Sequence, residues 1–263
     1  MERKVCAAAV QFNIALGEVE TNLAHVREQL SALKSKDCHL AVLPEMWSTG
    51  YDYKRLGDLS EQTPRICQVL AEMSAELGIV IVGSLPDKRD GTIYNTAFVM
   101  DGGETVGSYS KLHLFSTMGE DRYLGAGDKT LVVQTSVGRI GVAICYDLRF
   151  PELFRKLALD GAEILCIPAE WPHPRGEHWR TLLRARAIEN QMPVVAANCC
   201  GVQGKLDFAG MSMVISPWGD ILAEAKGQTD TPLAILDFKQ MEDYRFRINC
   251  FRDRRPEIYG TLP

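Results

Sequence analysis

The sequence has no apolar stretch long enough to cross a bilayer, and it has no convincing secretory leader. Arg3 and Lys4 precede an apolar stretch at residues 5–10, but Gln11 interrupts it before it reaches the length of a signal-peptide core. We therefore expect a cytoplasmic protein.

A basic surface is also missing. The chain has 29 Lys and Arg against 34 Asp and Glu, which gives a formal net charge of -5 and a pI near 5.6. Nucleic acids and anionic membranes are bound by concentrated positive charge, so neither is an expected partner. An anionic small-molecule substrate would need arginines placed locally in its site.

Motifs for metals and phosphates are absent as well. The sequence contains no HExxH, no Walker-type phosphate loop and no complete GxGxxG, and Gly125-Ala126-Gly127 is interpreted as a simple turn. The 8 cysteines lack CxxC spacing and lie mostly in apolar runs, which favours small core residues over a zinc site or a redox pair. We expect neither a metal nor an organic cofactor.

No Pro/Gly/Ser-rich linker or charge run divides the 263 residues, of which 46% are hydrophobic and 24% charged. One globular domain over residues 1–263 is the prediction. Short apolar runs predict buried strands, and apolar stripes at helical spacing predict helices between them. The expected strands are residues 5–12, 40–43, 79–83, 139–144, 164–167 and 194–197, and the expected helices lie around residues 23–33, 63–77, 151–160 and 177–190.

The ends of the expected elements carry further signals. Thr63 is a candidate N-cap with Pro64 at the first helical position, and Gly78 would end that helix. Turn signals at Asn95, at Gly102-Gly103 and at residues 217–220 suggest hairpins beside the strands that helices connect. A mixed sheet therefore fits better than a purely parallel one.

Two of the buried runs end in residues that can carry chemistry. Residues 40–43 lead through Pro44 into Glu45, and residues 141–144 lead into Cys145. Ligands of open α/β sheets bind beyond the carboxyl ends of strands, so these positions are candidates for a site. Each residue alone has an ordinary alternative, a helix cap or salt-bridge partner for Glu45 and a small core residue for Cys145.

A thiol beside a carboxylate can perform nucleophilic catalysis. The thiol attacks as thiolate and needs a base, and burial could raise the pKa of Glu45 towards neutrality so that it could serve. Attack on an amide also creates an oxyanion that needs fixed donors. Lys111 is a candidate because an apolar and aromatic segment follows it, although a snorkelling surface lysine is the alternative.

Three motifs carry a resemblance to a known family. They are Leu43-Pro44-Glu45, the stretch from Tyr109 to Phe115 (YSKLHLF), and the stretch from Gly141 to Glu152 (GVAICYDLRFPE). In residues, order and spacing, the chain resembles the nitrilase superfamily of carbon-nitrogen hydrolases over nearly its whole length.

The resemblance implies a fold, a site and an assembly. The fold is α/β, a four-layer αββα sandwich with two mixed sheets. The site is a Glu45, Lys111 and Cys145 triad, with Glu120 positioning substrate or lysine and the backbone N–H of Tyr146 holding the oxyanion. The assembly is a homodimer.

The residues after Cys145 narrow the implied substrate. True nitrilases continue Cys-Trp-Glu, whereas Cys145-Tyr146-Asp147 and the segment beginning Ala169-Glu170-Trp171 resemble the bacterial ω-amidase branch. Its members hydrolyse the terminal amide of 2-oxoglutaramate and related acids. Arg149 and Arg175 are candidates for pairing with the substrate carboxylate, and Trp171 and Phe115 for walls of its pocket. All four also have structural alternatives: a salt bridge for the arginines, core packing for the rings.

Other readings stay open at this point. Another amidase of the superfamily, acting on N-carbamoyl amino acids, aliphatic amides or deaminated glutathione, would share the motifs. A Cys-His protease would have to use His113 or His178, although neither carries such a family's signature. A non-catalytic scaffold of the same fold and a redox-sensing thiol at Cys145 complete the alternatives.

Overall fold

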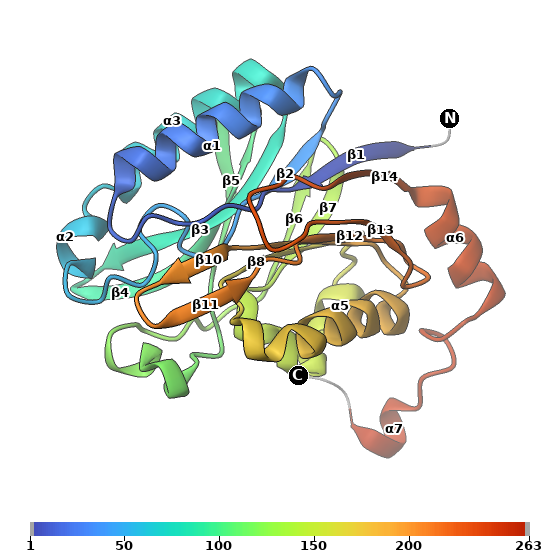
Figure 1. Ribbon diagram of the computed structural model, residues 1–263. Helices are drawn as coiled ribbons and strands as arrows, with labels where there is room; N and C mark the ends of the chain where they lie inside the picture. Colours follow the sequence, from blue (N-terminus) through green and yellow to red (C-terminus); the bar gives the residue numbers. More distant parts are fainter. Residues whose placement is uncertain (1–2, 261–263) are drawn as a thin grey trace.

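The computed structural model describes residues 3–260, and two six-stranded sheets form its centre (Figure 1). The first has the order β14-β1-β2-β3-β4-β5 and the second β13-β12-β9-β8-β7-β6. The strands of the first are Leu233–Asp237, Lys4–Ala9, Leu40–Val42, Val80–Arg89, Thr92–Asp101 and Glu104–Ser110, and those of the second are Ile221–Glu224, Met213–Ile215, Val194–Asn198, Ile164–Ala169, Gly138–Val142 and Leu131–Thr135. A separate hairpin pairs β10 (Cys200–Gln203) with β11 (Leu206–Ala209).

Both sheets are mixed. β1, β2 and β3 pair in parallel, as do β7, β8 and β9, and the outer strands pair antiparallel. The expected hairpin turns at Gly102-Gly103 and at residues 217–220 join β4 to β5 and β12 to β13. Asn95 was expected in a turn, and that expectation is wrong because this residue lies inside β4.

Helices cover the outer face of each sheet, which confirms the four-layer αββα sandwich. Along β1, Val5, Ala7 and Ala9 belong to the core that the two sheets share, whereas Cys6 and Ala8 pack with residues of α1 and α3. This alternation follows from the two-residue period of a strand. The helices are α1 (Val19–Lys34), α2 (Leu56–Ser60), α3 (Thr63–Leu77), α4 (Pro151–Leu159), α5 (Gly176–Asn190), α6 (Phe238–Arg247) and α7 (Pro256–Tyr259).

Three of the four expected helices, α3, α4 and α5, begin and end within a residue or two of the expected positions, whereas α1 begins at Val19, four residues before the expected start. Gly78 ends α3 in the left-handed region, as expected, but Gln62 rather than Thr63 is the N-cap residue. Thr63 instead donates its hydroxyl to the carbonyl of Pro86 at 2.5 Å. In residues 3–260 no helix combines the length and the apolar character needed to span a membrane.

The stretch Gly125-Ala126-Gly127 is not the simple turn that was expected. Gly125 forms a bridge to Tyr94 of β4, and the N–H of Gly127 donates to the carbonyl of Lys111 at 2.9 Å. A Cβ at Gly127 would lie 2.1 Å from the carbonyl oxygen of Ser110, so only glycine allows this close approach. These residues thus brace the segment that carries Lys111.

A substitution between the sheets tests this packing. Leu40 of β2 is fully buried in the shared core, so Leu40→Ala should lower the free energy of unfolding by about 2–5 kcal/mol. Leu159→Ala is the matched control, because that side chain is 43% exposed and should change stability by less than about 0.5 kcal/mol. Denaturant unfolding measures both, and equal effects would contradict the assigned layers.

Candidate active site

Four short segments from both sheets converge at one end of the sandwich. Glu45 follows β2 and Lys111 follows β5 in the first sheet. Cys145 follows β7 and Glu170 follows β8 in the second. Because the sheets pack face to face, these strand ends meet, and all four side chains are buried.

Lys111 lies at the centre of this group. Its Nζ donates to Glu45 Oε1 and to Glu120 Oε1, both at 2.8 Å, and all three side chains are almost completely buried. The segment is fixed by the N–H of Lys111, which donates to the carbonyl of Asn95 at 2.9 Å. Lys111 is therefore not the snorkelling surface lysine that its sequence allowed.

Glu45 is held by donors on both carboxylate oxygens. Oε1 accepts from Lys111 and from Asn95 Nδ2 at 2.7 Å, and the Tyr51 hydroxyl lies 2.6 Å away. Oε2 accepts the backbone N–H of Glu170 at 2.8 Å. Burial raises the pKa of Glu45, but the charge of Lys111 and the donors around the carboxylate outweigh it, so the pKa lies below its usual value.

The lowered pKa of Glu45 corrects the expectation that desolvation would raise it towards neutrality. The cation was the missing factor, since an ammonium within hydrogen-bond distance favours the ionised carboxylate. The opposite holds for Cys145, whose pKa is raised well above its usual value by burial and then by the charge of Glu45. The resting pair is therefore a carboxylate and a thiol.

Cys145 begins a short 3-10 helix, Cys145–Arg149, with a backbone φ of 45°. Residues other than glycine rarely adopt this left-handed conformation, and the strain marks a position that its surroundings fix. The first N–H groups of a helical turn have no partner within the helix. The N–H of Tyr146 can therefore face an oxyanion that forms beside the thiol.

Glu120 is placed next to Lys111 by a sharp loop. Gly119 adopts the left-handed region at a φ of 78°, and a 3-10 turn, Glu120–Arg122, follows it. The carboxylate accepts the N–H of Phe115 at 3.1 Å in addition to the bond from Lys111. Burial raises the pKa of Glu120 and Lys111 lowers it, with the result above its usual value.

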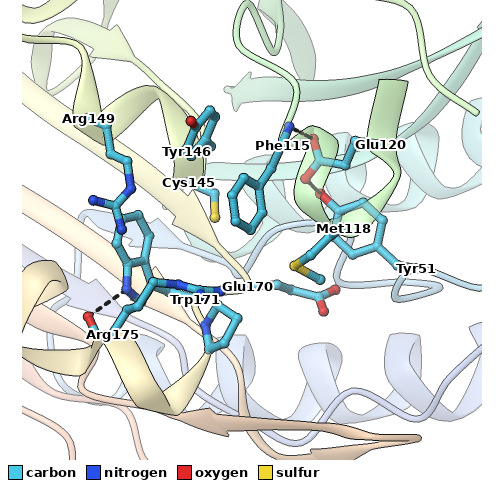
Figure 2. Close-up of a pocket in the computed structure, with 11 residues that line it drawn as sticks. Tyr51, Phe115, Met118, Glu120, Cys145, Tyr146, Arg149, Glu170, Trp171 and Arg175 are labelled. Atoms are coloured by element: carbon cyan, nitrogen blue, oxygen red, sulfur yellow. Dashed lines mark hydrogen bonds between the residues drawn. The ribbon is translucent and has the colours of Figure 1, made fainter. Parts of the chain in front are cut away.

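A pocket with about 320 Å³ of empty space opens in front of Cys145 (Figure 2). Eleven residues line it: Tyr51, Phe115, Met118, Glu120, Cys145, Tyr146, Arg149, Glu170, Trp171, Pro172 and Arg175. All four side chains that the sequence suggested for substrate binding are among them. In Figure 2 Arg149 and Arg175 lie on the Trp171 side of the thiol, and Glu120 lies on the opposite side with Tyr51.

Each arginine of the pocket lies over an aromatic ring. The guanidinium of Arg149 is 4.8 Å from the ring centre of Trp171, and that of Arg175 is 5.3 Å from the ring centre of Phe115. Nη2 of Arg149 lies 3.3 Å from Nδ1 of His178. Within residues 3–260, neither guanidinium forms an ion pair with a carboxylate. The salt-bridge alternative for these arginines is thus not what the structure has.

Sequence reasoning missed several residues around the thiol. Asn95 was read as a turn residue, Tyr51 lies in a loop without a motif, and Met118 had no signal at all. Glu170 stood in a quoted motif without a role, yet it is buried, and within residues 3–260 its carboxyl oxygens meet no hydrogen-bond partner. Burial raises its pKa well above the usual value and the charge of Glu45 adds to this, although the charge of Lys111 acts in the opposite direction.

The histidines do not support a Cys-His pair. His113 Nδ1 lies 2.8 Å from Asp147 Oδ1, and His178 lies against Arg149, so in the part of the chain described here neither imidazole hydrogen-bonds to Cys145. Within the same residues, no group of three His, Cys, Asp or Glu side chains is arranged to hold a metal ion.

The fold and the site together define a class of cysteine-dependent hydrolases in which a buried carboxylate and a buried ammonium lie beside the thiol. The chain belongs to the carbon-nitrogen hydrolase family, which matches residues 6–246, within the nitrilase superfamily. It is similar to the 2-oxoglutaramate amidase of Bacillus subtilis strain 168, with 38% identity over 255 residues that cover 96% of this chain and 98% of the relative.

Solved structures agree with this assignment. A carbon-nitrogen hydrolase from Helicobacter pylori G27 superimposes with a TM-score of 0.92 at 28% identity, covering 98% of this chain and 97% of its own. A mutant amidase from Nesterenkonia sp. AN1 has a TM-score of 0.87 at 25% identity, covering 98% and 96%. In that structure the acetamide moiety of fluoroacetamide is covalently added to the active-site cysteine. The chain is therefore an amidase-type hydrolase of carbon-nitrogen bonds.

Removing the central cation tests the role of the buried cluster. Lys111→Met leaves two carboxyl groups buried without their ammonium, which should cost about 3–5 kcal/mol of unfolding free energy. Amide turnover should fall by about 10²–10³-fold through the lost oxyanion donor. Lys129→Met, at an exposed position, should change neither quantity. Wild-type turnover in Lys111→Met would exclude the lysine from the chemistry.

Proposed function

We propose that this amidase hydrolyses the terminal carboxamide of a small ω-amide acid such as 2-oxoglutaramate to the acid and ammonia. The observation that carries the proposal is the pair of guanidiniums in the pocket of Cys145, each held over an aromatic ring and neither paired with a carboxylate of residues 3–260. The similarity to 2-oxoglutaramate amidase adds to it. A cytoplasmic location, a homodimer and a single domain over residues 1–263 stay predictions.

The proposed reaction begins with a proton transfer. Glu45, ionised in the resting site, accepts the thiol proton as Cys145 Sγ attacks the carboxamide carbon. Lys111 Nζ and the N–H of Tyr146 hold the resulting oxyanion. Glu120 keeps the ammonium of Lys111 in place from its other side.

Glu45 then acts as an acid. The low pKa that makes it a weak base in the resting site makes its protonated form a strong donor to the departing nitrogen, which leaves as ammonia. A water that Glu45 deprotonates attacks the thioester, and the carbon-sulfur bond breaks to release the acid. The thiol recovers its proton from Glu45.

The charge of the pocket favours an acid amide over an amino acid amide. A carboxylate can pair with Arg149 or Arg175, and a guanidinium binds it bidentately. Trp171 and Phe115 would hold the carbon chain between their rings. The α-ammonium of glutamine would have to approach the same two cations, so 2-oxoglutaramate and succinamate should be better substrates than glutamine.

Substitution of the arginines tests this preference. Arg149→Ala and Arg175→Ala should each lower kcat/KM for 2-oxoglutaramate by about 10- to 150-fold, equivalent to about 1.5–3 kcal/mol for a charged hydrogen bond. Turnover of a neutral aliphatic amide should change little. Arg27→Ala, at an exposed position of α1, is the control. Equal losses with acidic and neutral amides would remove the arginines from carboxylate recognition and favour the aliphatic-amide alternative.

The pH dependence tests the state of Glu45. The base must be ionised, and its lowered pKa keeps it so below the ordinary range of a glutamate. Its activity is therefore lost only as the pH falls through that low value, and kcat/KM should show no acidic limb between about pH 5 and 7. An acidic limb of kcat/KM between those pH values that disappears in Glu45→Gln would mean that Glu45 titrates there. That result would contradict the lowered pKa of this carboxyl.

A further inference from the structure

Asp147 lies two residues after Cys145 and is fully buried behind the pocket. Its Oδ2 accepts the backbone N–H of Ile144 at 2.9 Å and the Tyr109 hydroxyl at 2.7 Å. Its Oδ1 accepts the backbone N–H of His113 at 3.0 Å, and Nδ1 of the same residue lies 2.8 Å away. Both oxygens are thus occupied by donors from two separate segments.

The positions of these donors along the chain are informative. Tyr109 and His113 lie two residues before and two residues after Lys111, and Ile144 immediately precedes Cys145. The first pair belongs to the segment at the end of β5, and Ile144 belongs to the segment after β7 in the other sheet. A single carboxylate therefore joins the segment that carries the cation to the segment that carries the thiol.

The connection continues into the pocket wall. The ring of His113 stacks on Phe150 with centres 3.6 Å apart, and Phe150 meets the ring of Tyr146 edge-on at 5.4 Å. Tyr146 is also the residue whose N–H faces the proposed oxyanion. A change at Asp147 would thus reach both oxyanion donors without any contact between Asp147 and the substrate.

We propose that Asp147 is a positioning residue that fixes Lys111 Nζ and the Tyr146 N–H relative to Cys145 Sγ, and so controls stabilisation of the oxyanion. The proposal rests on the proposed amidase mechanism. A carboxylate suits this position because it only accepts hydrogen bonds, and the backbone N–H groups of Ile144 and His113 and the Tyr109 hydroxyl all donate to it. Burial raises the pKa of Tyr109 and the charge of Asp147 raises it further, so this hydroxyl stays a neutral donor.

Asp147→Asn is the informative variant. Its amide keeps the size of the side chain but turns one acceptor into a donor, which must face either His113 or the Tyr109 and Ile144 pair. A displacement of about 1 Å in catalytic groups can cost on the order of 10²-fold. We therefore expect kcat for 2-oxoglutaramate to fall by about 10²-fold while KM stays within about 3-fold.

A second rate separates positioning from a general loss of structure. Methyl methanethiosulfonate converts Cys145 to a mixed disulfide: a sulfur-sulfur bond forms, another breaks, methanesulfinate leaves and the thiol proton passes to Glu45 or solvent. This reaction uses the thiol but creates no oxyanion. Modification of Cys145, followed by peptide mass spectrometry, should keep within about 3-fold of the wild-type rate in Asp147→Asn.

Two variants complete the design. Tyr109→Phe removes one donor and should lower kcat by a smaller factor with unchanged modification, and it replaces Asp147→Asn in the test if that variant does not fold. Asp128→Asn, an exposed position with the same charge change, should behave as wild type. The proposal would be overturned if Asp147→Asn lowered the rate of amide turnover and the rate of Cys145 modification by the same factor. Wild-type turnover in both Asp147→Asn and Tyr109→Phe would also overturn it. Undiminished turnover in Cys145→Ala would instead overturn the amidase mechanism itself.

Discussion

The structure depends on one buried ammonium group shared by two carboxylates. Lys111 Nζ lies 2.8 Å from both Glu45 and Glu120, in a region where an unpaired charge would be prohibitively costly. Because the cation is fully enclosed, it keeps Glu45 ionised even though burial favours the neutral acid. Glu170 is a third buried carboxyl in this region, and its pKa is raised well above the usual value first by burial and then by the charge of Glu45.

The sandwich explains how residues that lie far apart in the chain reach that ammonium. Four strands end at the same edge of the two packed sheets, and a side chain of the site follows the end of each strand within three residues. Small residues such as Ala7 and Ala9 lie in the core between the sheets. The strained backbone at Cys145 and the bonds to Asp147 then set the thiol against the lysine segment.

Local patterns in the sequence predicted most of the fold and about half of the site. The apolar runs before Glu45 and Cys145 located the strand ends, because a buried strand must be apolar on both faces. The pairing of Asn95 with Glu45 could not be found this way, since it depends on how β4 lies across the sheet from β2. The direction in which the pKa of Glu45 is shifted could not be predicted either, because it depends on a cation 66 residues away in the chain. The motifs of the family, rather than spacing, brought Lys111 into the prediction.

The central proposal is that the buried carboxylate and ammonium promote the formation and the hydrolysis of a thioester on Cys145. Rapid quenching of the enzyme during turnover of 2-oxoglutaramate, followed by peptide mass spectrometry, tests it most directly. The account predicts a mass increase equal to the substrate minus ammonia on the peptide that contains Cys145, and loss of that species on treatment with hydroxylamine. Turnover with an unmodified Cys145, or an acyl group on another cysteine, would contradict it.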